Sequence, residues 1–156
     1  MSGLRIDVAD LLAHPGARRA CSVAAELDGL ATSAVAGAGP LEVDVTLEHI
    51  ADGIVVRGTV RTRWAADCSV CLRPLTEELV TAVDELFEPK PVDGETYRLE
   101  GHELDLEQLA RDAVVLELPL APHCKERCEA GLASDTPSDE EHNRDPRWAA
   151  LSELEL

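Results

Sequence analysis

Residues 41–50, LEVDVTLEHI, and residues 54–64, IVVRGTVRTRW, decide the fold of this chain. In the first stretch Leu and Val alternate with Glu, Asp and Thr, which is the period-two pattern of a half-buried strand. In the second stretch Val56, Val60 and Trp64 fall on one face and arginines fall on the other. The Asp-Gly pair between them is a tight-turn signal, so the two stretches predict an antiparallel hairpin.

A third apolar run, residues 76–87 (TEELVTAVDELF), follows a turn and ends just before a proline. As a strand, it would place Leu79, Val83 and Phe87 on one face. The same run also fits a helical period, so a helix is the alternative. The turn before it and the proline after it favour a strand that pairs back onto the hairpin.

A helix is predicted to begin at Asp105. Asp105 is a good N-cap residue, and Gln108 stands three residues later, as a capping box requires. The apolar residues that follow lie along one stripe, which would face the sheet. Pro119 ends the helix, and the Pro- and Gly-rich residues 88–102 before it are predicted to form a loop.

These elements predict an α+β fold, an antiparallel β-sheet or partly open barrel with one main helix packed on it. Alternation over residues 4–8 adds a short strand followed by a helical turn, whereas the Ala-, Gly- and Ser-rich residues 21–39 permit no assignment. We expect residues 1–133 to form a single α+β domain. Residues 134–156 are expected to form an acidic tail with a candidate docking segment around Trp148.

The chain of 156 residues carries a net charge of −17, which limits the kinds of molecule that it can bind. Such a charge repels nucleic-acid phosphate and anionic lipid at long range and attracts basic proteins. On charge alone, simple solubility is the stronger explanation. Because aromatic residues make up only 3% of the chain, the core must be built from Leu, Val and Ala.

The N-terminal residues lack the basic and apolar regions of a signal peptide, and no apolar run is long enough to cross a membrane. We therefore expect a cytoplasmic protein without a membrane partner. In that reducing compartment the five cysteines are not expected to form a disulfide framework.

The strongest chemical signal is the pair Cys68 and Cys71, spaced as in a zinc knuckle and placed between two predicted strands. A second pair, Cys124 and Cys128, follows the predicted helix, with one residue more between its cysteines. Four thiolates are the ligand set that zinc prefers in closed, tetrahedral structural sites. Free thiols are the alternative for all of them.

Other ligands and other roles for the cysteines are less well supported by the sequence. His123 and His142 could substitute as ligands, and Cys21 stands alone as a small hydrophobic residue. A thioredoxin-like redox pair needs a helix N-terminus to lower the first thiol's pKa. The Leu-Arg-Pro sequence after Cys71 indicates a turn instead.

The chain resembles the YceD family of large-ribosomal-RNA-subunit accumulation proteins in several motifs that occur in the same order. These are PLEVDVTLEHIADGIVVRGTV followed by CSVCLRPL, then ELDLEQLARDAVVLELPLAPHC, then DPRWAALSEL. Together they cover roughly residues 4–156. The resemblance implies a role in the accumulation of 23S ribosomal RNA (rRNA) and in ribosome assembly, with no catalytic activity.

One departure from the family pattern concerns the C-terminal cysteines. Family members typically carry a run resembling C-x-G-L-C-x-x-C-G after the cysteine that matches Cys124. Here Ala133 occupies the third cysteine position and Thr136 the fourth. The resemblance therefore leaves two outcomes: zinc held across the fold by both cysteine pairs, or loss of the metal in this member.

Four arginines are candidate nucleic-acid contacts: Arg57, Arg61, Arg63 and Arg73. The first three form a basic stripe on one strand face, which could touch rRNA phosphate. The alternative is that the stripe pairs with Glu42, Asp44 and Glu48 on the neighbouring strand, as opposite charges across a hairpin often do.

The leading hypothesis is a non-enzymatic factor that contacts the pre-large-subunit ribosomal particle through rRNA or a basic ribosomal protein. A metalloenzyme is disfavoured, because four cysteines would leave no open position for a reactive water. The chain also has no nucleophile elbow, phosphate-binding loop or H-E-x-x-H motif, and no small-molecule substrate is expected. The alternative is a zinc- or redox-responsive regulatory binding protein using the same thiols.

Overall fold

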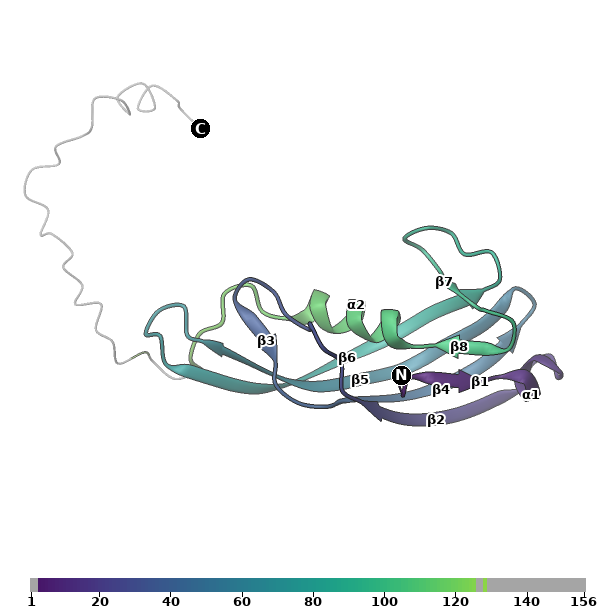
Figure 1. The fold of residues 1–156 in the computed structure, drawn as a ribbon, viewed down its shortest axis with the longest axis horizontal. Helices are drawn as coiled ribbons and strands as arrows, with labels where there is room; N and C mark the ends of the chain where they lie inside the picture. Colours follow the sequence, from purple (N-terminus) through teal and green to yellow (C-terminus); the bar gives the residue numbers. More distant parts are fainter. Residues whose placement is uncertain (1–2, 126–127, 129–156) are drawn as a thin grey trace, which may run out of the picture.

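The computed structural model describes residues 3–125 and residue 128, which form a mixed α+β fold with one main helix (Figure 1). In chain order the elements are β1 (Arg5–Asp7), α1 (Ala9–Leu12), β2 (Arg18–Ala25), β3 (Val35–Gly37), β4 (Leu41–Ile50), β5 (Gly53–Asp67), β6 (Pro74–Glu88), β7 (Tyr97–Arg98), β8 (Glu103–Asp105) and α2 (Glu107–Glu117). None of the described helices is long and apolar enough to cross a membrane. The predicted tail, residues 134–156, lies outside the described residues.

The main sheet has six strands in the order β2-β4-β5-β6-β7, with β3 pairing beside β5 beyond the end of β4. All its pairs are antiparallel except β6 with β7, and β1 and β8 form a separate two-stranded sheet. The structure shows the predicted sheet, and this sheet is not closed into a barrel. Barrel closure requires the two outermost strands to pair, but β7 has only two residues and does not reach β2.

The predicted hairpin is confirmed as β4 and β5, whose register runs from Glu42 opposite Arg61 to Ile50 opposite Gly53. Alternation places Val56, Val60 and Trp64 on the buried face, as the sequence predicts. Gly58 is required within this hairpin, because a side chain there would collide with the backbone carbonyl of Asp44.

The third apolar run is a strand, as favoured from the sequence. It is the second half of a long hairpin in which β6 pairs with β5 from Asp67 opposite Pro74 to Ile54 opposite Phe87. Leu79, Val83 and Phe87 all lie on its buried face. This segment forms a strand and not a helix because a strand hydrogen-bonds to the backbone of β5 along its whole length and also buries all three side chains.

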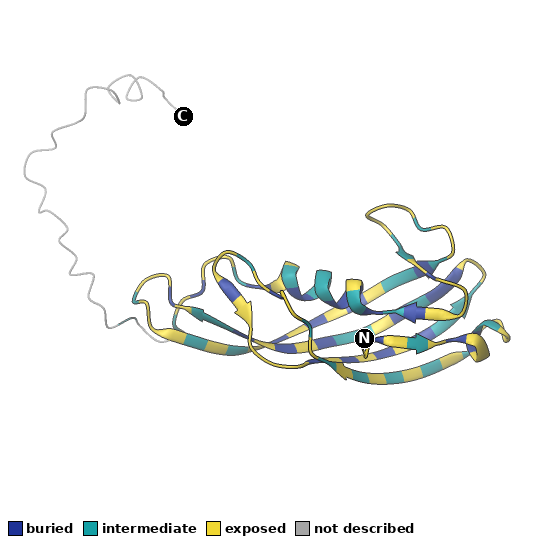
Figure 2. Ribbon diagram, viewed as in Figure 1, coloured by how far each residue is buried: buried dark blue, intermediate teal, exposed yellow. Residues whose placement is uncertain are grey.

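Helix α2 lies across the inner face of β6 and β5 and buries Leu109, Ala110 and Val114 there (Figure 2). The predicted N-cap was wrong by one position. Asp105 is the last residue of β8, held in extended form by pairing with Arg5, so Leu106 occupies the cap. The Asp105 carboxylate still accepts a hydrogen bond from the Glu107 backbone N–H at 2.9 Å.

The capping box does not form either. The Gln108 side chain donates to the Asp112 carboxylate, 2.7 Å away, and does not reach back to the cap. At the other end of the chain, the predicted short strand and helical turn are β1 and α1. The unassigned residues 21–39 contain the greater part of β2 and all of β3, and the predicted loop at residues 88–102 contains the two-residue β7.

Candidate metal centre

The first two cysteines lie in the tight turn between β5 and β6. The turn is closed by a hydrogen bond from the Cys68 N–H to the Arg73 carbonyl (2.8 Å) and another from the Leu72 N–H to the Cys68 carbonyl (2.9 Å). Leu72 adopts φ of 57°, the left-handed conformation that lets the chain reverse directly after Cys71. The turn therefore points both sulfur atoms to one side.

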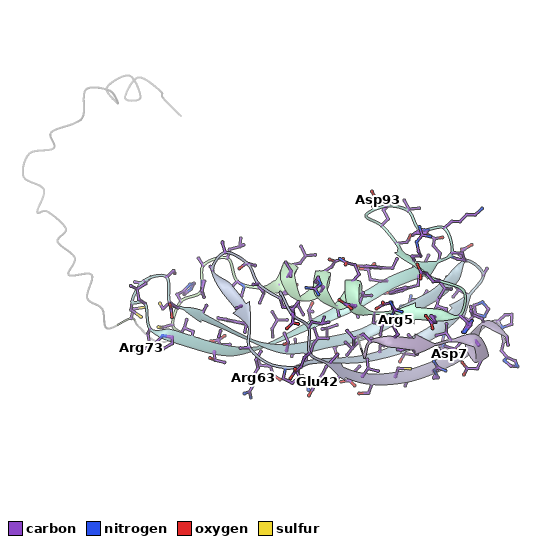
Figure 3. The ribbon with its side chains drawn as sticks, in the orientation of Figure 1. Arg5, Asp7, Glu42, Arg63, Arg73 and Asp93 are labelled. Carbon is purple, nitrogen blue, oxygen red and sulfur yellow. The ribbon has the colours of Figure 1, made fainter. Side chains whose placement is uncertain are left out.

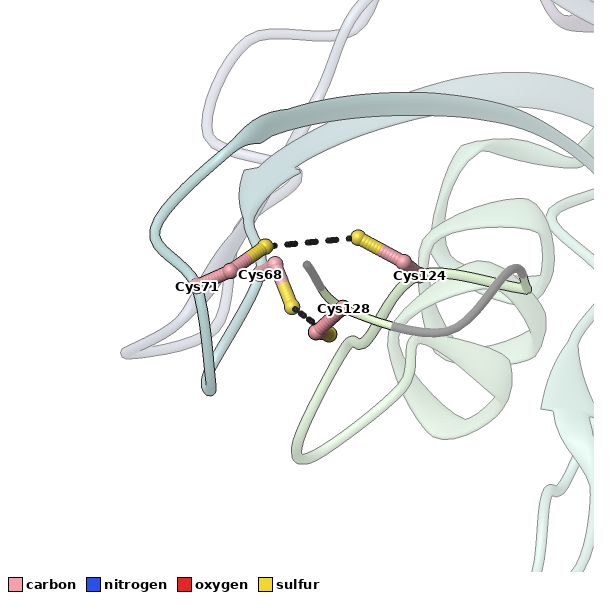
Figure 4. A group of neighbouring side chains, drawn as sticks. All are labelled: Cys68, Cys71, Cys124 and Cys128. Carbon is pink, nitrogen blue, oxygen red and sulfur yellow. Dashed lines mark hydrogen bonds between the residues drawn. The ribbon is translucent and has the colours of Figure 1, made fainter. Parts of the chain in front are cut away.

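The second pair is delivered by the segment that follows α2. Leu118 ends the helix in extended conformation, and the Ser69 N–H then donates to the Pro122 carbonyl at 2.7 Å. Lys125 adds an ion pair with Glu77 on β6 at 3.2 Å. These contacts bring the segment beside the turn, so that Cys124 and Cys128 face the first pair (Figure 4).

The four sulfur atoms form a compact cluster. The Cys68 and Cys128 sulfurs are 3.6 Å apart, those of Cys71 and Cys124 are 3.5 Å apart, and all four lie within 4.8 Å of one another. A tetrahedral site with metal–sulfur bonds of about 2.3 Å has sulfur–sulfur edges of about 3.8 Å. The spacing is far too long for disulfides, and it fits a four-sulfur metal site.

The cysteine turn lowers the pKa of the Cys68 thiol. The backbone N–H of Cys71, followed by that of Val70, hydrogen-bonds to the sulfur and lowers the pKa of the Cys68 thiol to about 5. Cys68 is also fully buried. Hydrogen bonds from backbone N–H groups to a sulfur favour the deprotonated form, which is the form that binds metal ions.

The opposite pair of thiols is held neutral. Contact with Cys71, together with burial, raises the pKa of Cys124 to about 12, and contact with Cys68 raises the pKa of Cys128. These thiols resist ionisation together, because several thiolates in contact would repel one another. A divalent cation would remove this repulsion and displace the thiol protons.

The other candidate ligands stand apart from the cluster. His123 lies on the same segment, but its Nδ1 contacts the Ala121 carbonyl at 2.9 Å. His142 lies outside the described residues. Cys21 lies on β2, where it is half-buried against the core, in keeping with its interpretation as a small hydrophobic residue. The donor set therefore consists of four cysteines, which suits zinc held in a closed site.

Two of the four candidate arginines are engaged in ion pairs on both sides. Arg57 contacts Asp84 at 2.9 Å and Glu48 at 3.8 Å. Arg61 contacts Glu78 at 3.4 Å and Glu42 at 4.0 Å. The sequence predicted that these arginines could pair with Glu42, Asp44 and Glu48 of β4. Glu42 and Glu48 do so, whereas Asp44 contacts Ser22 of β2.

Sequence reasoning missed the carboxylates on the other side of these arginines. Asp84 and Glu78 come from β6, and they become neighbours of Arg57 and Arg61 only through the β5–β6 register. The signal was the alternation of β6, which places Glu78 and Asp84 on the same face.

The remaining two arginines have no ion pair within the described part of the chain. Arg63 projects from the solvent-facing side of β5, near Glu42 (Figure 3). Arg73 lies in the cysteine turn at the end of the molecule. Arg57, Arg61 and Arg63 thus lie along one exposed face of β5, and Arg73 lies beyond the end of that strand, in the cysteine turn.

The fold and the cluster define an α+β protein in which four cysteines lie where the tip of a long β-hairpin meets the segment after the main helix. Residues 56–155 match the family described as large ribosomal RNA subunit accumulation protein YceD. The chain belongs to the YceD family.

Its relatives include uncharacterized proteins of Mycobacterium tuberculosis and Mycobacterium bovis. Each is 31% identical over 170 residues, an alignment covering 98% of this chain and 82% of the relative. An uncharacterized protein of Mycobacterium leprae is 29% identical over 140 residues, covering 81% of this chain and 64% of the relative. No solved structure matches the chain significantly.

Proposed function

We propose that this protein is a cytoplasmic, non-enzymatic factor that supports 23S rRNA accumulation and assembly of the large ribosomal subunit, and that zinc stabilises it. Membership of a family whose name describes accumulation of large-subunit rRNA carries the proposal. The cluster of four cysteines supports the zinc, because its spacing and chemistry match a closed structural site.

Zinc in this site would supply structural cross-linking. Cys68 and Cys71 would hold it from the hairpin tip, and Cys124 and Cys128 from the segment after α2. The backbone N–H groups of Val70 and Cys71 would offset part of the negative charge that four thiolates place around one cation. With four protein ligands the site has no open position for a reacting water, in keeping with a binding role.

In this proposal, Arg63 and Arg73 are the arginines that contact rRNA phosphate. Arg57 and Arg61 each already face two carboxylates, so a phosphate would have to displace them. The net charge of −17 further favours a basic ribosomal protein as a second contact within the same particle.

An RNA-binding assay tests this assignment. Replacing Arg63 and Arg73 with Ala should weaken binding to a 23S rRNA fragment and reduce the salt slope by about 0.7–0.9 per lost phosphate contact. The matched variant, with Arg57 and Arg61 replaced, should bind almost as the native protein does. Unchanged affinity and slope in the first variant would leave contact to a ribosomal protein as the route to the particle.

The function itself is tested in a Mycobacterium strain that lacks its own relative. The strain should show less 23S than 16S rRNA and fewer large subunits, and expression of this protein should restore both. A variant with Cys68 and Cys71 replaced by Ser should restore them poorly, whereas Cys21→Ser should restore them fully. An unaltered rRNA ratio in the deletion strain would refute the proposed function.

A further inference from the structure

Strand β2 forms one margin of the main sheet and, among the described residues, pairs only with β4 (Figure 1). In its register Arg18 lies opposite Glu48 and Ala25 opposite Leu41. Just before the strand, the Ala17 carbonyl accepts the His49 N–H at 3.0 Å. Because hydrogen bonding alternates along an antiparallel strand, the odd-numbered residues of β2 bond to β4.

The even-numbered residues of β2 therefore direct their backbone N–H and C=O groups away from the sheet. Within the described part of the chain, no backbone hydrogen bond reaches Ala20, Ser22 or Ala24 from that side. Gly3 passes near the Ala24 carbonyl without donating to it. The side chains at all three positions are small and exposed, so another strand could approach closely.

Within the described residues, the middle of this edge lacks the charges, prolines and bulges that normally prevent strand addition. Natural edge strands are protected by charged side chains, prolines or bulges. The long free edge of β6 follows that pattern, since it begins at Pro74 and carries Glu77, Glu78, Asp84 and Glu85. Residues 20–25 of β2, by contrast, contain no charge, proline or bulge.

The β2 sequence is complementary to itself. If two copies pair antiparallel about a two-fold axis at Ser22, Arg18 of one copy lies opposite Glu26 of the other, at both ends of the pairing. Between them, Ala20 faces Ala24 on the outer side, and Cys21 faces Val23 on the inner side. Residues with outward N–H and C=O groups meet one another in this register, as antiparallel pairing requires.

The charges that this register uses lie at the surface. Glu26 is exposed and makes no ion pair within the described residues. The Arg18 side chain is 68% exposed and pairs with Glu48 of the same copy at 2.8 Å, so in the dimer it would share Glu48 with Glu26 of the other copy. Shifting the axis to Ala20 would place Arg18 opposite Ser22, and shifting it to Ala24 would place Arg18 beyond the opposing strand. An axis at Val23 would place Arg18 opposite Asp28, which lies in a turn three residues beyond the end of β2, whereas Glu26 follows the strand directly. The Ser22 axis therefore joins opposite charges at both ends of the paired strands.

We propose that two copies of this protein associate through β2, forming one continuous sheet across a two-fold axis at Ser22. The interface combines the free backbone groups of the even-numbered residues, two Arg18–Glu26 pairs, and apolar contact between Cys21 and Val23. An isologous contact of this kind closes on itself and leaves the cysteine cluster, at the tip of the β5–β6 hairpin, outside the interface.

Sedimentation velocity of the full chain with metal bound tests the association. A dimer is expected at micromolar concentration, and Ala20→Pro should weaken it by about tenfold or more, because it removes two outward hydrogen bonds. That N–H does not bond to β4, so the variant should keep its fold. Ala20→Ser is the matched control and should dimerise normally. A monomer throughout, or an unaffected dimer in Ala20→Pro, would overturn the proposal.

Cross-linking tests the register independently of that proline. With Val23→Cys, oxidised glutathione should yield a covalent dimer in which peptide mass spectrometry finds Cys21 joined to the thiol introduced at position 23. With Ala25→Cys, whose position faces Arg19 in the proposed register, this link to Cys21 should be absent. Equal cross-linking at both positions, or none at position 23, would refute the Ser22 axis.

Discussion

Replacing Cys68 with Ser should remove most of the stability that the proposed zinc would provide. Cys68 is fully buried, and the N–H groups of the turn lower the pKa of its thiol to about 5. Loss of one of four ligands weakens the metal site and releases the hairpin tip from the segment after α2. Cys21→Ser, on half-buried β2, should leave the contribution of zinc unchanged.

The size of the effect follows from the loop that the metal closes. The cysteines that face each other are separated by 60 and 53 positions. A cross-link closing a loop of that length removes unfolded-chain entropy worth about 4 kcal/mol, treating the metal as a simple cross-link. Wild-type protein with zinc should therefore be about 4 kcal/mol more stable than chelated protein, and Cys68→Ser should lose most of that difference.

Urea unfolding with and without a chelator measures this difference directly for the wild type and both variants. The comparison within each variant cancels the cost of the Ser side chain itself. A wild-type unfolding curve that does not move on chelation would refute the reasoning. So would equal losses of the zinc-dependent stability in Cys68→Ser and Cys21→Ser.

Three further changes test other parts of the account. Gly58→Ala should destabilise the protein by about 2–3 kcal/mol in denaturant unfolding, because the methyl group meets the Asp44 carbonyl, whereas Gly39→Ala, with ordinary space, should change stability by less than about 0.5 kcal/mol. Leu72→Gly should stabilise the protein by up to about 1 kcal/mol by relieving the positive φ, since its side chain is 74% exposed; a loss would show that this side chain packs on something. Burial and a hydrogen bond to Asp112 raise the pKa of Tyr97 to about 12, so phenolate absorbance should rise near pH 12 in native protein and near 10 in urea. Because the folded pKa is the higher one, the stability from Tyr97 is complete below pH 10 and is lost between 10 and 12; Tyr97→Phe should remove that part of the pH dependence, and a native pKa near 10 would contradict the assignment.

The hairpin and the third strand could be predicted because their alternation is strong. Along residues 41–50 and 54–64, one face is apolar and the other charged, and this pattern survives in the structure as burial on one side of the sheet. Strand β2 carries the same alternation only weakly. Its small Ala, Ser and Cys side chains differ little in polarity, so the period-two pattern could not be recognised in the sequence.

Details that depend on pairing between distant segments could not be derived from local sequence. Asp105 has the chemistry of an N-cap, but β1 holds it in a strand and moves the cap to Leu106. The partners of Arg57 include Asp84, which only the β5–β6 register reveals. In each case a tertiary contact decided between two locally acceptable outcomes.

The candidate site was predictable in identity but not in arrangement. The spacing of Cys68 and Cys71 indicated a knuckle, and the second pair supplied the remaining ligands. Their approach depends on the length of α2 and on the hydrogen bond from Ser69 to Pro122, neither of which is visible as a motif.

The metal content of the native protein, measured with thiol reactivity on the same sample, tests the central claim most directly. The account predicts one zinc per chain, with the four clustered cysteines protected until a chelator removes the metal. A metal-free protein in which all five thiols react at comparable rates would contradict it.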